Sequence, residues 1–316
     1  MSTVAELYVS AFASDVLAGL TADGQKKLPA KYFYDDLGTK LFEAITLLPE
    51  YGLTRADCRV LERCSTEVAR RAGCSSIVAE LGSGTGGKTS RILSKLAGPG
   101  LAYYPIDVSR EALDACSREL SEYARVEPIQ AEYLEGLREL SRRRPAGARL
   151  LLLFSGSSIG NFEPRERREF LCRLRAGLRP GDLFLLGADL VKDLDVMLTA
   201  YDDPCGVTAA FNLNLLARMN RELDANFDLR TFSHLVLWNH DEERIEMHLV
   251  SRKYQHVLLS ALNVSVVFEG GETIWTESSH KFTETGLEEM ASESGFTVLN
   301  QWTDAEWPLI ETLWQA

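Results

Sequence analysis

An alternation of short apolar runs with helical stretches, which begins at Ser76, constrains the fold of this 316-residue chain more than any other feature. The expected strands are residues 76–81, 102–107, 126–130, 149–154 and 183–189. The expected helices are residues 87–96, residues 109–123 with Ser109 as the cap, and residues 164–177 with Pro164 in the first turn. Strands and helices that alternate in this way form a parallel sheet covered on both faces. The sequence therefore predicts a doubly wound α/β domain.

The pattern changes after Asp189. Two helical stretches, 192–201 and 207–223, precede two long alternating stretches, 228–239 and 244–253, whose junction at 240–243 is typical of a hairpin. Shorter strand-like runs follow, and the helix–strand pattern returns at Thr283. We expect a doubly wound domain made of residues 57–190 and 282–316, and an inserted α+β substrate-binding domain made of residues 191–281 together with residues 1–56.

The charge balance argues against nucleic acid as a partner. The chain has 34 basic and 46 acidic residues, a formal charge of −12 and an isoelectric point near 5.0. Proteins that bind nucleic acids usually present a basic domain or stripe, because counterion release supplies most of their affinity. The arginine clusters at 142–144 and 165–168 are short, and glutamates interleave the second one. We interpret them as solvated helix faces.

Composition also limits the location and the kind of site. No apolar run approaches the roughly 20 residues of a membrane-spanning helix. Residues 1–15 lack the basic start and the cleavage site of a signal peptide, so we expect a cytoplasmic protein. Six cysteines form no C-x-x-C pair and five histidines have no close ligand spacing, which favours reduced thiols and no metal site. No long apolar stripe requires a dimer, so we expect a monomer.

A glycine-rich loop, residues 82–88, lies between the first strand and its helix. Gly82, Gly84 and Gly87 fit the spacing G-x-G-x-x-G, which lets a backbone turn tightly and approach a ligand. That spacing alone also suits NAD, or a turn that binds nothing. Glu80 discriminates, because an acid before the loop is unfavourable beside a pyrophosphate but favourable beside the cationic methionine portion of S-adenosylmethionine. The run resembles the first motif of Rossmann-like methyltransferases.

Further residues extend this cofactor site. Asp107 ends the second strand, where a carboxylate can accept both ribose hydroxyls. Glu132 and Tyr133 follow the third strand, where they are positioned to meet the adenine or to form a plain loop. The expected cofactor-binding residues in this region are Glu80, Gly82, Ser83, Gly84, Lys88, Asp107, Glu132 and Tyr133.

Several unusual motifs occur in order over nearly the whole chain. They are residues 32–35, 48–51, 54–55, 80–89, 156–162, 200–203, 207–212, 245–247 and 274–282. Together they resemble the histidine-specific methyltransferase family, whose best-known member makes the trimethylated betaine of histidine on the way to ergothioneine. The resemblance implies that the amino acid is held between the Rossmann-like domain and the inserted domain.

The resemblance also implies roles for individual residues. Asn161 and Tyr201 match the positions that fix the α-amino and carboxylate end of the substrate, near the backbone of Gly156. Tyr34 matches the tyrosine beside the reacting amine and the cofactor, and is the expected catalytic residue. The positions that line or bond the imidazole are Tyr51, Met247, Glu277 and Ser279.

Strand geometry supports the last pair independently. In a strand, Glu277 and Ser279 point to the same face, because side chains alternate with period two. A carboxylate can accept from one imidazole N–H, and a hydroxyl can donate to or accept from the other nitrogen. Glu277 alone is equally typical of a solvated strand, and Met247, Tyr34 and Tyr201 alone are typical of a core.

Three residues depart from the family pattern. Glu132 stands where an aspartate usually meets the adenine, Gly52 replaces a common second tyrosine, and Gly87 adds a flexible residue to the cofactor loop. None of them changes the pair formed by Glu277 and Ser279.

The expected reaction is three methyl transfers from S-adenosylmethionine to the α-amine of L-histidine, giving hercynine and S-adenosylhomocysteine. Three alternatives remain at this point: the same chemistry on another amino acid such as a tryptophan derivative, an NAD-linked oxidoreductase, and a silent binding protein. Glu277 and Met247 argue against the first, and Glu80 argues against the second.

Overall fold

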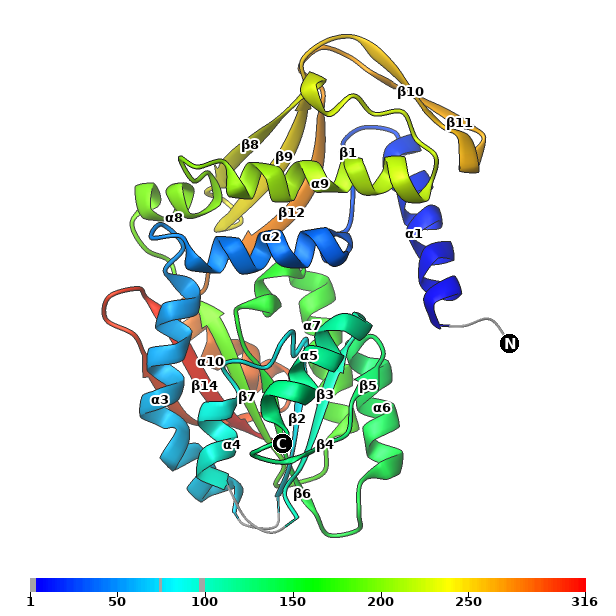
Figure 1. Ribbon diagram of the computed structural model, residues 1–316. Coiled ribbons are helices and arrows are strands. Elements are labelled where there is room, and N and C mark those ends of the chain that lie inside the picture. Colours follow the sequence, from blue (N-terminus) through cyan, green and yellow to red (C-terminus); the bar gives the residue numbers. More distant parts are fainter. Residues whose placement is uncertain (1–3, 74–75, 97–99) are drawn as a thin grey trace. The chain divides into compact units, whose positions relative to one another are not determined.

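The computed structural model describes residues 4–73, 76–96 and 100–316 of the chain. The chain divides into two compact units, drawn in Figure 1. One consists of residues 1–52 and 193–280, and is called the insertion unit below. The other consists of residues 53–192 and 281–316, and is called the sheet unit. The boundaries expected at residues 57, 190 and 282 lie within four residues of these divisions.

The sheet unit contains an eight-stranded sheet within its described residues. Its strands are β2 (Ser76–Leu81), β3 (Ala102–Asp107), β4 (Arg125–Val126), β5 (Ile129–Gln130), β6 (Arg149–Phe154), β7 (Leu183–Asp189), β13 (Thr297–Thr303) and β14 (Leu309–Gln315). Their order is β13-β14-β7-β6-β2-β3-β4, and β5 also pairs with β3. Strands β2 to β7 pair in parallel, whereas β14 is antiparallel to β7 and β13 is antiparallel to β14. The predicted α/β fold is confirmed.

Helices cover both faces of this sheet. On one face lie α3 (Leu53–Ala72), α4 (Ser90–Leu96) and α5 (Arg110–Leu120); on the other lie α6 (Tyr133–Arg143), α7 (Pro164–Gly177) and α10 (Glu284–Glu293). Alternate strand residues serve the two cores, so Val78 packs with the first set and Ile77 and Ala79 with the second. Because the inner strands are buried on both faces, they read as continuous apolar runs, which is why β3, β6 and β7 match their predicted bounds.

The order of the strands creates a switch point between β2 and β6. Strand β2 continues to β3 on one side and pairs with β6 on the other. Ligands of such sheets bind beyond the carboxyl ends of the strands where the order reverses. The glycine loop follows β2 and residues 155–161 follow β6, so the fold brings these two segments to the same edge.

The insertion unit is built on a four-stranded sheet in the order β1-β12-β9-β8. These strands are β1 (Lys26–Lys27), β8 (Phe232–Asn239), β9 (Arg244–Ser251) and β12 (Thr273–His280). Strands β8 and β9 form the expected hairpin, in which Asn239 pairs with Arg244. The helices are α1 (Val4–Thr21), α2 (Asp36–Leu47), α8 (Leu194–Tyr201) and α9 (Val207–Glu222), of which α9 packs on α2 and on the sheet (Figure 1).

Some predicted elements differ from the structure. Pro128 divides the strand expected at 126–130 into β4 and β5, because proline has no N–H for the ladder. A separate ribbon of β10 (Gln255–Leu259) and β11 (Val264–Phe268) includes one strand that was not predicted. The helices expected at 87–96 and 192–201 begin later, at Ser90 and Leu194.

Within the described residues, no helix is both long and apolar enough to cross a membrane. Five of the six cysteines are present as free thiols, and Cys74 lies outside the described residues.

Candidate functional site

The glycine loop departs from the sequence interpretation in one respect. Gly82, Gly84 and Gly86 have φ values of +66°, +51° and +78°, a region that side chains disfavour. A Cβ on Gly86 would lie 2.7 Å from the sulfur of Cys116, whereas a Cβ on Gly87 would meet nothing within 4 Å. The third glycine that the loop requires is therefore Gly86 and not Gly87, because close packing on α5 needs the missing side chain.

Glu80 fastens this loop to the sheet. Its Oε2 accepts hydrogen bonds from the hydroxyls of Thr89 and Tyr103, each at 2.5 Å, and the residue is only 4% exposed. Burial raises the pKa of Glu80, against the opposite effect of both hydroxyls. The side chain lies on the face of the sheet that α3 to α5 cover. Its contacts in the structure are thus with the loop and the core, and a contact with a sulfonium cofactor stays a prediction.

Asp107 binds the same loop from the end of β3. Its Oδ2 accepts from the N–H of Gly84 at 3.0 Å, and its Oδ1 accepts from the N–H of Ser109 at 2.9 Å. Burial raises the pKa of Asp107, although the backbone donors oppose the shift. A carboxylate has about four acceptor positions, so each oxygen keeps capacity for a ribose hydroxyl.

Tyr133 lies over the loop, and Glu132 directly precedes it in the chain. The phenol oxygen of Tyr133 would be 3.2 Å from a Cβ on Gly82, and its ring packs edge-on against Phe154 with centroids 5.2 Å apart. Glu132 is exposed and precedes the first turn of α6. Of the two residues expected near the adenine, Tyr133 is the one that the structure places against the glycine loop.

Lys88 connects the loop to the segment after β6. Its ammonium forms an ion pair with Asp57 of α3, and a Cβ on Gly156 would lie 3.2 Å from the nitrogen. Gly156 and Ser157 have positive φ values of 76° and 61°. The hydroxyl of Ser157 accepts from the N–H of Asp189 at 2.9 Å, which fixes this turn. Ser83, a predicted cofactor residue, is buried within the loop itself.

Asn161 ends the short 3₁₀ turn Ser158–Asn161, immediately after this Gly156–Ser157 turn. It is half-buried and lies five residues beyond Gly156. The structure therefore gathers Gly82, Ser83, Gly84, Lys88, Gly156 and Asn161 on two adjacent loops at one edge of the sheet.

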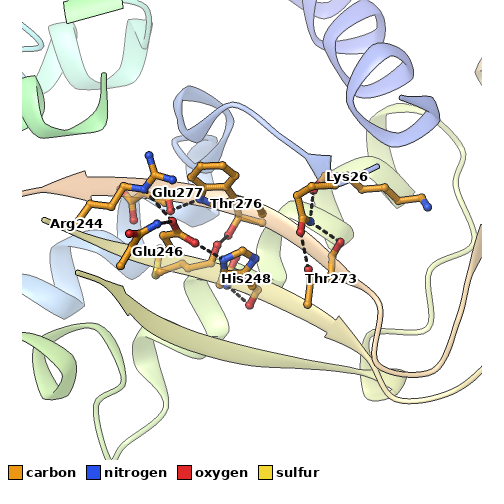
Figure 2. Close-up of polar contacts among 12 residues, drawn as sticks. Lys26, Arg244, Glu246, His248, Thr273, Thr276 and Glu277 are labelled. Carbon is orange, nitrogen blue, oxygen red and sulfur yellow. Dashed lines mark hydrogen bonds and ion pairs between the residues drawn. The ribbon is translucent and has the colours of Figure 1, made fainter. Parts of the chain in front are cut away.

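In the insertion unit, an irregularity in β12 decides which side chains share a face. Trp275 pairs with His248 and Glu277 pairs with Met247, so Thr276 is an extra residue in the ladder. The Thr276 hydroxyl donates to the carbonyl of Met247 at 2.9 Å (Figure 2). Glu277, Ser279 and Met247 consequently lie on one face, as predicted from period two.

The same irregularity sends Trp275 to the opposite face. There the guanidinium of Arg244 lies 4.5 Å from the Trp275 ring, and His248 stacks on it with centroids 6.0 Å apart. Glu246 accepts from Arg244 at 2.8 Å and bonds His248 at 3.0 Å (Figure 2). This face is a closed polar cluster, distinct from the face of Glu277.

Tyr201 joins the face of Glu277 through Ser279. The two hydroxyls are 2.7 Å apart, and either one can be the donor. Met247 is 1% exposed, whereas Glu277 is half-buried. A carboxylate, two hydroxyls and a thioether therefore meet on one face of β9 and β12.

His234 and Asn212 support Tyr201 and were not identified from the sequence. Asn212 Nδ2 donates to His234 Nδ1 at 2.9 Å, and His234 Nε2 donates to the carbonyl of Tyr201 at 2.8 Å. This pattern requires a neutral ring, in agreement with burial, which lowers the pKa of His234. Positions 232 and 234 point to the same face of β8, toward the helices. This period-two pattern is the sequence signal that could have indicated His234.

Tyr34 and Tyr51 belong to an aromatic cluster in the same unit. The Tyr34 ring lies edge-on to Phe42 and Phe211, with centroids 5.5 and 5.8 Å apart. The ring centroids of Tyr51 and Phe42 are 6.2 Å apart. Tyr51 is 8% exposed, whereas Tyr34 is 37% exposed. Tyr34 is thus the accessible member of the cluster. Within the described ranges, no three His, Cys, Asp or Glu side chains are grouped to hold a metal ion.

Comparison with known proteins identifies the family of this chain. The family model "Histidine-specific methyltransferase, SAM-dependent" matches residues 12–316. A histidine N-alpha-methyltransferase of Mycolicibacterium smegmatis is 44% identical over 95% of this chain and 93% of its own length. One of Mycobacterium tuberculosis is 43% identical over 92% and 90%.

A third relative, ergothioneine biosynthesis protein 1 of Neurospora crassa, is 30% identical over 89% of this chain but 32% of its own length. The family match excludes the NAD-linked alternative. The chain belongs to the S-adenosylmethionine-dependent, histidine-specific methyltransferase family.

Proposed function

We propose that this enzyme methylates the α-amine of L-histidine three times, giving hercynine as a step towards ergothioneine. The observation that carries the proposal is the face of Met247, Tyr201, Glu277 and Ser279, which suits an imidazole. The names of the two most similar relatives reported above agree with this substrate. The insertion unit would accordingly serve as the substrate-binding part and the sheet unit as the cofactor-binding part.

The residues at the switch point fit S-adenosylmethionine. The backbone of Gly82, Ser83 and Gly84 would approach the methionine portion, and Asp107 would accept the ribose hydroxyls. Tyr133 would pack on the adenine, with Glu132 beside it. The ammonium of Lys88 would face a carboxylate, because it lies beside Gly156 at the carboxyl ends of the strands.

Imidazole selectivity follows from hydrogen bonding. Glu277 accepts from one ring N–H, and Ser279, whose hydroxyl already bonds that of Tyr201, serves the other nitrogen. An indole has a single N–H and no acceptor, so it would form only one of these two hydrogen bonds, a loss of about 0.5–1.5 kcal/mol. Met247 and Tyr51 supply the apolar walls. The site therefore favours histidine over tryptophan.

When bound, S-adenosylmethionine supplies a methyl group on its sulfonium sulfur. The neutral α-amine would attack this methyl group, and S-adenosylhomocysteine would leave. Each transfer places one more methyl group on nitrogen and releases one proton. Alignment supplies most of the catalysis, because the reacting atoms must come within about 3–3.5 Å. Gly156, Asn161 and Tyr201 would fix the amino and carboxylate groups for this alignment.

Tyr34 is the proposed residue beside the reacting nitrogen. A tyrosine with an ordinary pKa near 10 is a weak base, so it would orient the amine first and relay a proton second. Its ring would also stabilise the accumulating cation by about 0.5–2 kcal/mol. Its exposure of 37% leaves the phenol accessible to a ligand.

A panel of amino acids tests the substrate. Purified enzyme is incubated with S-adenosylmethionine and each of the twenty amino acids, and the products are weighed by mass spectrometry. Histidine should gain about 42 Da, because proximity directs about three methyl groups to one nucleophile. If histidine stays unmodified while tryptophan gains methyl groups, the proposed specificity is wrong.

Glu277→Ala tests the imidazole contact. Loss of a charged hydrogen bond should raise the KM for histidine by about tenfold to a hundredfold and leave cofactor affinity unchanged. Ser278→Ala is the matched control, because Ser278 is the adjacent residue on the opposite face, paired with Glu246. An unchanged KM in Glu277→Ala would remove Glu277 from the pocket.

A further inference from the structure

Three ionisable side chains, Lys88, Asp57 and Glu311, lie close together, and only Lys88 has a role so far. Lys88 forms its ion pair with Asp57, which has no exposed surface. Burial, the largest single influence, lowers the pKa of Lys88, but the charge and hydrogen bond of Asp57 and the nearby carboxyls of Glu80 and Glu311 together outweigh it, and the net pKa is raised. The ammonium therefore stays charged. Its side chain is 28% exposed, so the cation has a buried partner on one side and access to a ligand on the other.

Glu311 is the third member of this group, and it lies on β14 opposite Gly187 of β7. Its exposure is 0%, and a Cβ on Gly187 would lie 2.5 Å from its Oε1. Gly187 is thus the residue that leaves space for the carboxyl group. Among the described residues, no N–H group and no hydroxyl donates a hydrogen bond to either carboxyl oxygen of Glu311 or to Oδ1 of Asp57.

The charges of this group do not balance if both carboxyls ionise. With Glu80, which is also buried and acts on Lys88, up to three carboxylates would face one ammonium, and a surplus buried charge is strongly unfavourable. Burial and the neighbouring charge of Asp57 raise the pKa of Glu311 far above its ordinary value. Asp57 is among the groups that raise the pKa of Glu311, so the two carboxyl groups lie close together, and a hydrogen bond between them would require a proton on one of them. Asp57 bonds Lys88, so the proton belongs on Glu311.

We infer that Glu311 is a neutral acid that donates its proton to Asp57, and that the two together position Lys88 for the carboxylate of the cofactor's methionine portion. This inference rests on the proposed function only through the identity of the ligand. Asp57 acts as the charged partner of Lys88. Glu311 acts through Asp57, by occupying its second oxygen and keeping the carboxylate in place. Both are positioning residues.

Two amide substitutions separate the assigned roles, although the two carboxyls are equally buried. Asp57→Asn removes the negative charge beside Lys88, so the affinity for S-adenosylhomocysteine should fall by about tenfold or more. Glu311→Gln keeps an N–H donor of the same size and should bind this ligand nearly as wild type does. Glu311→Leu removes the donor and should weaken binding again. Titration calorimetry without histidine measures all three affinities.

The pH dependence of stability provides the second measurement. Unfolded Glu311 would lose its proton above about pH 4.3, while the folded residue keeps it, so unfolding releases a proton. Wild-type stability should therefore fall, relative to that of Glu311→Gln, as the pH rises from about 5 to about 8. Urea unfolding of the two proteins across this range gives the difference.

Each outcome supports or overturns the inference. Wild-type affinity in Asp57→Asn, equal losses in Asp57→Asn and Glu311→Gln, or parallel pH profiles in the urea experiment would overturn it. If Asp57→Asn does not fold, Glu311→Gln against Glu311→Leu still decides. A wild-type enzyme that binds S-adenosylhomocysteine but leaves histidine unmodified would refute the proposed substrate and not this inference. If wild type binds no cofactor, the role of Lys88 is refuted, and the pH profiles still decide where the proton lies.

Discussion

Two of the buried ion clusters in the described part of the sheet unit differ in their balance. In the Asp182 cluster, formed by Arg144 and Asp182, one cation faces one anion, with bonds of 2.5 Å to both carboxylate oxygens. Backbone N–H groups of Leu150 and Arg179 bond the same oxygens at 3.0 and 2.8 Å. In the Lys88 cluster, formed by Asp57, Lys88 and Glu311, one cation faces two acids, and no N–H group or hydroxyl of the described residues donates to three of the carboxyl oxygens.

The two clusters also lie at opposite ends of the parallel strands. Asp182 precedes β7 and bonds the start of β6, whereas Lys88 follows β2 and lies beside Gly156, which follows β6. The carboxyl ends of such strands hold ligands, and the amino ends serve the fold alone. Arg144 and Asp182 have their bonds within the protein, whereas Lys88 keeps a partly exposed side chain beside Gly156, as expected when only the carboxyl ends of the strands bind a ligand.

The largest predicted effect concerns the complete cluster. Asp182→Ala should lower the free energy of unfolding by about 3–5 kcal/mol, because it leaves a buried guanidinium without its partner. Urea unfolding measures the loss, and calorimetry should show wild-type cofactor affinity in the folded protein. A loss of stability below about 1 kcal/mol, or weakened cofactor binding, would erase the contrast between the clusters.

The next effect tests how packing positions the ligand end. Gly86→Ala should cost about 2–4 kcal/mol, because its Cβ would overlap Cys116 and Leu120 and its φ is positive. Gly87→Ala is the control, since its Cβ would meet nothing within 4 Å. Thermal unfolding compares the two variants. Equal effects would restore Gly87 as the third required glycine.

The smallest effect concerns a second balanced pair, Asp304 with Arg59. The Arg59 guanidinium bonds lower the pKa of Asp304 to about 2, below its ordinary value near 3.8. The stabilisation is therefore complete above about pH 4 and is lost as the pH falls to about 2. Arg59→Gln should remove about 1 kcal/mol of it, since Arg59 is partly exposed and screened. The difference between the urea midpoints of the two proteins should be smaller at pH 3 than at pH 6. A difference that stays constant would contradict this assignment.

The sequence predicted the fold where local signals were strong. Leu150–Phe154 and Leu183–Ala188 are apolar without interruption, because both faces are buried, and Pro164 marks the start of α7. The strand expected at 126–130 was too long, since the effect of Pro128 on the ladder was underestimated. The face of Glu277 and Ser279 was predicted correctly, but the extra residue Thr276, which moves Trp275 away, follows from pairing with β9 and leaves no local signal.

Asp57 and Glu311 were not identified from the sequence, for different reasons. Asp57 precedes Val60, Leu61 and Cys64 at helical spacing, so it lies on the apolar face of α3, which was a readable signal. Glu311 gives no such signal, because its burial depends on the space left by Gly187 in a strand 124 residues away. Ionisable groups brought together by tertiary contacts are visible only once the strand order is known.

The most direct test of the account is the position of the transferred methyl groups. L-Histidine is incubated with S-adenosylmethionine that carries a trideuterated methyl group, and the product is fragmented in a mass spectrometer. Three labelled methyl groups are expected on the α-nitrogen and none on the imidazole, because the proposed contacts of Glu277 and Ser279 would hold the ring away from the donor. Label on the imidazole, or a product that stops at one methyl group with excess donor, would contradict it.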